Sequence, residues 1–179
     1  MSVDQIPEIK VIIATALWLH AKGYSIRTIS VPKGEGRNSG EDKEMLVNKL
    51  KEAGVPLDDT NFTRDGPDII AHKNDEIWKI ECKGLGKGKA ATLRNNGDRA
   101  LASAVSYFDK KPGLKLGIAW PRHNEYLRYA NNRISQALRE TLGLTIFVYD
   151  GDKESIEEFG PLSDLPPPPM RRGRESLDA

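Results

Sequence analysis

The sequence predicts an α/β fold in which a mixed β-sheet of about five strands is flanked by helices on both faces. Segments with the 3.6-residue periodicity of amphipathic helices alternate with short apolar runs that are bounded by glycine and proline, as expected for helices that connect strands. The short runs are apolar on much of both faces, which is typical of a sheet that is covered on both sides. Two of these runs also form a hairpin pattern in the middle of the chain.

Each expected helix has one apolar stripe, and each expected strand is a short apolar run. The helices are predicted at residues 5–22, 41–53, 91–108 and 123–142, and the strands at 24–31, 68–71, 77–82, 114–120 and 144–149. On the last of these helices, we interpret Tyr126 and Tyr129 as part of a solvated face. Contact with nucleic acid is the alternative for these two aromatic residues.

The character of the chain changes after residue 150. Acidic residues dominate up to Asp164, and a proline run at 166–169 and a group of arginines follow. We therefore expect one domain over residues 1–150 and an acidic, then Pro/Arg-rich, tail over 151–179 that is extended or disordered. The proline run is also a segment that a partner protein could bind.

Composition sets limits on the function. Hydrophobic residues make up 38% of the chain and the formal net charge is only +1, so a surface that binds nucleic acid must be locally basic. The single cysteine, Cys82, cannot form an internal disulfide, which favours a reducing compartment. The apolar run at 11–19 is too short to span a bilayer and no secretory signal is recognisable, so we expect a cytoplasmic protein without membrane contact.

The most informative stretch covers residues 66–84 and reads GPDIIAHKNDEIWKIECKG. Two apolar, β-branched runs flank the turn signal Asn74-Asp75, and this pattern predicts a β-hairpin. If these two residues form the turn, Asp68 faces Glu81 across the hairpin. The opposite face then carries only apolar residues and Cys82, which is the pattern of a core face.

This register predicts a cluster of charges at one end of the hairpin. Directly opposed residues share a face, with Cβ atoms about 4.5–5.5 Å apart, and Lys83 points to the same face as Glu81. A divalent cation would remove the repulsion between Asp68 and Glu81, and hard oxygen ligands are those that Mg²⁺ prefers. Alternatively, Asp68 caps the strand entry, and Glu81 and Lys83 are an exposed strand end.

Pro67-Asp68, followed after twelve residues by Glu81-Cys82-Lys83, resembles the signature of the PD-(D/E)XK nuclease superfamily, whose fold is restriction-endonuclease-like. The resemblance covers nearly the whole of the expected domain. It implies that Asp68 and Glu81 bind Mg²⁺, for which Mn²⁺ can substitute, and that the Cys82 backbone carbonyl completes the coordination. It also implies that Lys83 orients or activates the attacking water and stabilises charge at the phosphate.

Superfamily members often carry a glutamate near the site in the first helix, and Glu8 matches this feature. Glu8 lies in line with Ile12 and Leu19 at helical spacing, so we expect it to face inward. The alternative is that Glu8 is a favourable acid near the positive end of the helix dipole. The helix at 41–53 falls where a minimal superfamily core often has only a turn, so we interpret it as an insertion or an edge support.

The segment after Lys83 is basic and rich in glycine, and it lies next to the expected site. We predict that polar residues in this segment and in the following helix bind the phosphate backbone of a nucleic acid; these are Lys87, Lys89, Arg94, Asn95 and Arg99. A solvated loop is the alternative. Farther along the same helix, we interpret Ser103 and Tyr107 as ordinary packing residues, and a variant of a Gln-x-x-x-Tyr pattern is the alternative.

These expectations combine into a Mg²⁺-dependent nuclease that hydrolyses DNA phosphodiester bonds. We expect an endonuclease with a role in restriction or defence, in repair or in the resolution of junctions. One alternative is a non-catalytic nucleic-acid-binding module on the same fold, and another is a scaffold protein that acts through its proline-rich tail. A homodimer would suit the cutting of two antiparallel strands.

Overall fold

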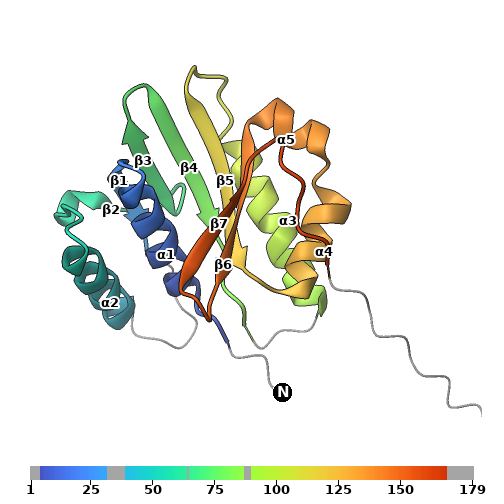
Figure 1. The fold of residues 1–179 in the computed structure, drawn as a ribbon. Helices are drawn as coiled ribbons and strands as arrows, with labels where there is room; N and C mark the ends of the chain where they lie inside the picture. Colours follow the sequence, from blue (N-terminus) through green and yellow to red (C-terminus); the bar gives the residue numbers. More distant parts are fainter. Residues whose placement is uncertain (1–4, 32–38, 64, 87–89, 169–179) are drawn as a thin grey trace, which may run out of the picture.

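The structure is a computed structural model that describes residues 5–31, 39–63, 65–86 and 90–168 (Figure 1). Its helices are α1 (Glu8–Ala21), α2 (Ser39–Glu52), the 3-10 helix η1 (Asp59–Asn61), α3 (Ala90–Ser106), α4 (Asn124–Arg133) and α5 (Gln136–Leu142). Its strands are β1 (Ser25–Ser30), β2 (Phe62–Thr63), β3 (Ile69–Lys73), β4 (Glu76–Cys82), β5 (Leu114–Pro121), β6 (Leu144–Asp150) and β7 (Ser155–Phe159).

These strands form one mixed sheet in the order β2-β1-β3-β4-β5-β6-β7. β3 is antiparallel to both β1 and β4, whereas β5 and β6 continue parallel to β4, and β7 pairs antiparallel with β6. The prediction of an α/β fold with a mixed sheet is therefore confirmed. The expected number of about five strands is wrong, because the described residues contain seven.

The two additional strands, β2 and β7, form the edges of the sheet. β2 contributes only two residues, which pair parallel with β1, and β7 pairs along its whole length with β6. The sheet therefore extends beyond residue 150, where we expected the domain to end and a tail to begin. Charged residues on an edge strand discourage its pairing with other chains. The acidic sequence of β7 therefore lacks the apolar pattern by which the other strands were predicted. Residues 169–179 of the expected tail lie outside the described residues.

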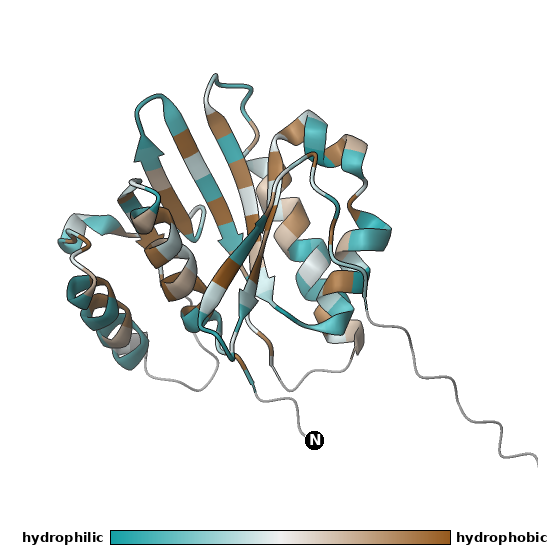
Figure 2. Cartoon of the chain, in the orientation of Figure 1, coloured by the Kyte–Doolittle hydropathy of each residue, from teal (hydrophilic) through white to brown (hydrophobic). Residues whose placement is uncertain are grey.

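Helices cover both faces of the sheet, so the molecule has two hydrophobic cores. On one face, α1 packs over buried residues of the central strands, such as Ile69, Trp78 and Phe147, and α2 packs against α1. On the other face, α3, α4 and α5 pack over Leu116, Trp120 and further residues of β5 and β6. Figure 2 shows that hydrophobic residues lie along the central strands, whereas the tip of the β3–β4 hairpin is hydrophilic. The helix that we interpreted as an insertion, α2, thus contributes to the first core.

The helix that we expected over residues 123–142 is divided into α4 and α5. Ile134 ends α4 with non-helical backbone angles, and the Ser135 hydroxyl then accepts a hydrogen bond from the Leu138 backbone N–H over 3.2 Å. Serine is among the residues preferred at the N-cap of a helix, which explains why a second helix begins after Ser135. None of the helices in the described ranges combines the length and the apolar character needed to cross a bilayer.

Candidate active site

The β3–β4 hairpin places two acidic side chains at one end of the sheet. The pairing runs over five residue pairs and ends at Ile69 and Ile80, which confirms the predicted register. Asn74 in the turn has a φ of 51°, a left-handed conformation that asparagine adopts more readily than most residues. Asp68 directly precedes Ile69, and Glu81 directly follows Ile80. The two carboxylates therefore lie beside each other where the hairpin ends.

Asp68 and Glu81 are both buried, with exposed fractions of 9% and 8%. The Cys82 backbone N–H donates a hydrogen bond of 2.6 Å to Asp68 Oδ2. Burial, and then the charge of Glu81, raise the pKa of Asp68 from 3.8 to about 7, because the ionised carboxylate loses water and meets a like charge. A buried pair of this kind is stabilised by either a proton or a cation.

Lys83 supplies a cation at this position. Its ammonium group donates hydrogen bonds to Glu81 Oε1 over 2.8 Å and to the Cys82 carbonyl oxygen over 2.7 Å. Burial alone would lower the pKa of Lys83, but the carboxylates of Glu8, Asp68 and Glu81 outweigh this effect and raise that pKa above 10.5. Lys83 is therefore a permanent positive charge at neutral pH.

Tyr107 contacts the other oxygen of Glu81. The Tyr107 hydroxyl donates a hydrogen bond of 3.0 Å to Glu81 Oε2. The interpretation of Tyr107 as an ordinary packing residue is therefore incomplete, since it binds a carboxylate of the candidate site. The sequence does contain a tyrosine near the end of the helix that follows the proposed catalytic strand. It does not show where that helix ends, so it does not predict the contact of Tyr107 with Glu81.

Glu8 reaches the site from the first turn of α1. Its carboxylate lies 3.9 Å from Lys83 Nζ and accepts a hydrogen bond from the Gly84 backbone. Burial raises the pKa of Glu8, and the nearby Lys83 charge offsets part of that effect. Two backbone hydrogen bonds between Ile6 and Leu85, of 3.0 and 2.7 Å, fix the start of α1 beside the end of β4. The expected inward orientation of Glu8 thus results from this pairing and from its place in the first turn.

Tyr126 supports the same segment from the other side. Its hydroxyl donates a hydrogen bond of 2.7 Å to the Gly84 carbonyl oxygen, and its ring stacks on Trp120. The prediction that Tyr126 and Tyr129 belong to a solvated helix face is wrong, because both side chains are buried. Aromatic residues next to arginines on an amphipathic helix are ambiguous, and here their rings complete the second core.

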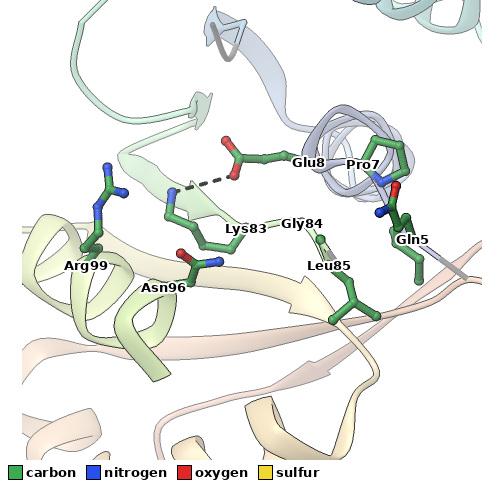
Figure 3. A pocket seen from close by; sticks show the side chains of 10 residues that line it. Gln5, Pro7, Glu8, Lys83, Gly84, Leu85, Asn96 and Arg99 are labelled. Carbon is green, nitrogen blue, oxygen red and sulfur yellow. Dashed lines mark ion pairs between the residues drawn. The ribbon is translucent and has the colours of Figure 1, made fainter. Parts of the chain in front are cut away.

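A polar pocket of about 640 Å³ opens beside Glu8 and Lys83. Figure 3 shows Asn96 and Arg99 projecting from α3 toward Lys83, while Glu8 approaches the same ammonium from α1. Gln5 lies at the far side of the pocket. The pocket therefore brings three elements together around the ion pair, and its lining is suited to a polar or charged ligand.

The predicted nucleic-acid contacts divide into three groups. Arg99 lines the pocket, as expected, whereas the described pocket lining includes neither Arg94 nor Asn95, which are exposed on α3. Asn96, the next residue along α3, lines the pocket together with Arg99. The predicted contacts Lys87 and Lys89 lie outside the described residues.

The donor set fits a hard divalent cation in its chemistry. Two carboxylates, Asp68 and Glu81, and the backbone carbonyl of Cys82 are oxygen ligands of the kind that Mg²⁺ takes with additional waters. Within the described residues, however, no group of three His, Cys, Asp or Glu side chains is arranged to hold a metal. Lys83 instead contacts two of the three expected donors. Binding of a cation by this set therefore requires Lys83 to move away.

Gly84→Ala should destabilise the fold and disturb the site. A Cβ at this position would lie 2.5 Å from the Glu8 backbone nitrogen and 2.7 Å from the Ile6 carbonyl oxygen. Both neighbours are backbone atoms and cannot rotate away, so we expect the free energy of unfolding to fall by about 2 kcal/mol. Denaturant unfolding measures this change. Gly86→Ala is a matched control, because a Cβ there meets nothing within 4 Å; equal effects of the two substitutions would contradict the steric explanation.

The function has to be inferred from these residues, since comparisons of the chain with protein families, with curated proteins and with solved structures found no match.

Proposed function

We propose that this chain is a Mg²⁺-dependent nuclease that hydrolyses DNA phosphodiester bonds on a restriction-endonuclease-like fold. The observation that carries the proposal is the buried cluster of Asp68, Glu81 and Lys83 at the end of the central hairpin. The mixed sheet with helices on both faces supports the PD-(D/E)XK resemblance, because that resemblance implies the same architecture. An ordinary surface ion pair would not need two carboxylates that are nine-tenths buried.

Asp68, Glu81 and the Cys82 carbonyl would hold the Mg²⁺ ion. A bound Mg²⁺ stabilises negative charge that develops on a phosphate and lowers the pKa of a coordinated water. Asp68 suits this role because its ionised form is unfavourable without a nearby cation, as its raised pKa indicates. Glu81 suits it because its Oε1 is held by a lysine, which can be exchanged, and not by a rigid backbone group.

Lys83 and Glu8 would have different roles in the reaction, one as a hydrogen-bond donor and the other as a proton acceptor. Lys83 keeps its proton, so it can donate a hydrogen bond to the attacking water or to a phosphate oxygen, but it is a poor base. Glu8 is better suited to accept the proton that the water loses, because burial raises its pKa above the ordinary value and its carboxylate lies 3.9 Å from Lys83 Nζ. Charge stabilisation by Lys83 would be the larger contribution.

DNA would enter through the polar pocket. Arg99 is exposed at its edge and Asn96 lines it, so both can contact phosphates that flank the reacting one. Lys87, Lys89 and Arg94 remain proposed contacts to the backbone, as does Asn95. Such contacts depend little on base sequence and weaken as the salt concentration rises. A cytoplasmic location and a homodimer also remain part of the proposal.

One observation favours a second candidate function, a nucleic-acid-binding module without catalysis. The Lys83 ammonium already neutralises Glu81 and contacts the Cys82 carbonyl, so the charged cluster is satisfied without a metal. In that case, DNA binding would survive chelation of divalent cations, and no substrate would be cut.

Cleavage assays on a panel of DNA substrates test the proposal. Supercoiled plasmid, linear duplex, single strand, flap and four-way junction should each be incubated with Mg²⁺, with Mn²⁺ and with a chelator. We expect cleavage of at least one substrate that requires the metal and that falls by about 10²-fold or more in Asp68→Asn and in Glu81→Gln, because each removes charge from the site. Metal-dependent cleavage at the full rate in either variant would refute the assignment.

Glu76→Gln is a matched control for these variants. Glu76 also lies on β4 and pairs with Lys115 over 2.6 Å, but it is at the opposite end of the strand. The Glu76→Gln variant should cleave DNA at the wild-type rate. This result would show that cleavage depends on the carboxylates of the site and not on every carboxylate of this strand.

A further inference from the structure

Tyr107 is held in place on two sides next to Glu81. Its backbone N–H donates to the Ala104 carbonyl at the end of α3, and its own carbonyl accepts a hydrogen bond from Lys79 Nζ over 3.3 Å. Ser103, one helical turn earlier, shares a hydrogen bond with the Tyr107 side chain. The phenol that donates to Glu81 Oε2 is therefore anchored by its own helix and by β4, which carries Glu81.

The Tyr107 hydroxyl is the donor that occupies the second carboxylate oxygen of Glu81. The hydrogen bond of 3.0 Å to Glu81 Oε2 is charge-assisted, and such bonds are stronger than those between neutral groups. Glu81 Oε2 is thus occupied by a fixed donor.

The two carboxylate oxygens of Glu81 therefore differ in how readily a cation could bind to them. Lys83, which is bound to Oε1 over 2.8 Å, lies on a flexible side chain and has a second carboxylate, Glu8, within 3.9 Å. It can move from Oε1 toward Glu8 without losing an anionic partner. Tyr107 has no comparable freedom, so Oε1 becomes free for a cation while Oε2 stays occupied.

We propose that Tyr107 determines the cation selectivity of the site by restricting Glu81 to a single coordinating oxygen. This inference rests on the proposed metal-dependent function. Mg²⁺ requires a compact octahedral shell and is satisfied by single carboxylate oxygens, whereas Ca²⁺ takes more ligands at longer distances and often binds both oxygens of one carboxylate. A glutamate with one occupied oxygen therefore disfavours Ca²⁺ more than Mg²⁺.

Tyr107→Phe tests the inference, because it removes only the hydroxyl and keeps the ring. The dissociation constants of Mg²⁺ and of Ca²⁺ should be measured by calorimetric titration for the wild type and for the variant. We expect Ca²⁺ to bind about tenfold more tightly in the variant relative to Mg²⁺, which is within the range for residues that contact metal ligands. The ratio of the two constants is taken within one protein, so a modest loss of stability does not affect it.

Tyr129→Phe is the matched control. Tyr129 also donates from its hydroxyl to a carboxylate, Asp98 Oδ1 at 2.9 Å, but neither residue belongs to the candidate site. Its Ca²⁺-to-Mg²⁺ ratio should equal that of the wild type. An unchanged ratio in Tyr107→Phe, or an equal loss of both affinities, would overturn the selectivity role and leave the nuclease proposal standing. A wild type that binds neither ion, and cuts no DNA with either, would overturn both.

Discussion

Lys83→Met should abolish DNA cleavage and, in the same protein, strengthen the binding of Mg²⁺. The Lys83 ammonium donates to Glu81 Oε1 and to the Cys82 carbonyl, which are two of the three proposed metal ligands. A divalent cation must displace this ammonium, so its removal takes away a competitor. Cleavage should fall by about 10²–10³-fold, as for the loss of other preorganised charge-stabilising groups, while Mg²⁺ affinity should rise by about tenfold.

The two effects have opposite signs, and this makes the variant informative. A lysine that acts in catalysis alone would leave Mg²⁺ affinity unchanged when it is replaced. A lysine that only neutralises the cluster would leave cleavage unchanged. Methionine matches the apolar stem of lysine in length and lacks only the ammonium group, so the packing of the stem around position 83 is preserved.

Calorimetric titration of Mg²⁺ at about pH 8.5 is the suitable measurement. The Lys83 charge lowers the pKa of Asp68, so its loss raises that pKa further, and a protonated Asp68 would hide the gain in affinity at neutral pH. Lys115→Met is the control, because Lys115 pairs with Glu76 at the opposite end of β4. Weaker Mg²⁺ binding by Lys83→Met than by the wild type at this pH would contradict the competition.

The parts of the site that could be predicted from the sequence are those fixed by local pairing. Two apolar runs around Asn74-Asp75 leave a hairpin few alternative registers, since a slip of one residue would turn the core face toward the opposite side. The positions of Asp68, Glu81 and Lys83 relative to one another follow from that register alone. The helices that cover the sheet were predictable because each has an apolar stripe, although the end of α3 and the division between α4 and α5 were not.

The parts that could not be predicted depend on contacts between distant elements. Tyr107 reaches Glu81 only because the segment that follows α3 lies beside β4, which no local pattern encodes. Asn96 lies in the pocket and Asn95 does not, and this difference of one residue is a rotation of about 100° on a helix. β7 was concealed by its acidic residues, because pairing with β6 and not its composition makes it a strand.

Asp68 should make the protein less stable as the pH rises from about 4 to about 7. Its pKa is 3.8 ordinarily and about 7 in the folded chain, so between these values the folded state binds a proton that the unfolded state does not. Stability falls with pH wherever the folded state binds more protons. The contribution is complete below about pH 4 and is lost once the pH passes about 7. It amounts to roughly 4 kcal/mol, at about 1.4 kcal/mol for each pKa unit.

Asp68→Asn isolates this effect from the other titrating groups. Asparagine resembles the protonated carboxyl group and can still accept the hydrogen bond from the Cys82 backbone N–H. The variant should match the wild type near pH 4 and exceed it at pH 8, with a midpoint of thermal unfolding about 10 °C higher at the upper pH. The same substitution at exposed Asp59 controls for the loss of one carboxylate from the chain.

Mg²⁺ should reverse the order of the two proteins at pH 8. The ion needs Asp68 ionised, so it binds the wild type more tightly as protons leave, and it stabilises the folded state in proportion. Asp68→Asn lacks this charge and should gain little. If, without Mg²⁺, thermal unfolding of the wild type and of Asp68→Asn differs by the same amount at pH 4 and at pH 8, Asp68 titrates at its ordinary pKa in the folded chain. The buried pair of carboxylates would then not repel each other strongly enough for a bound cation to stabilise them.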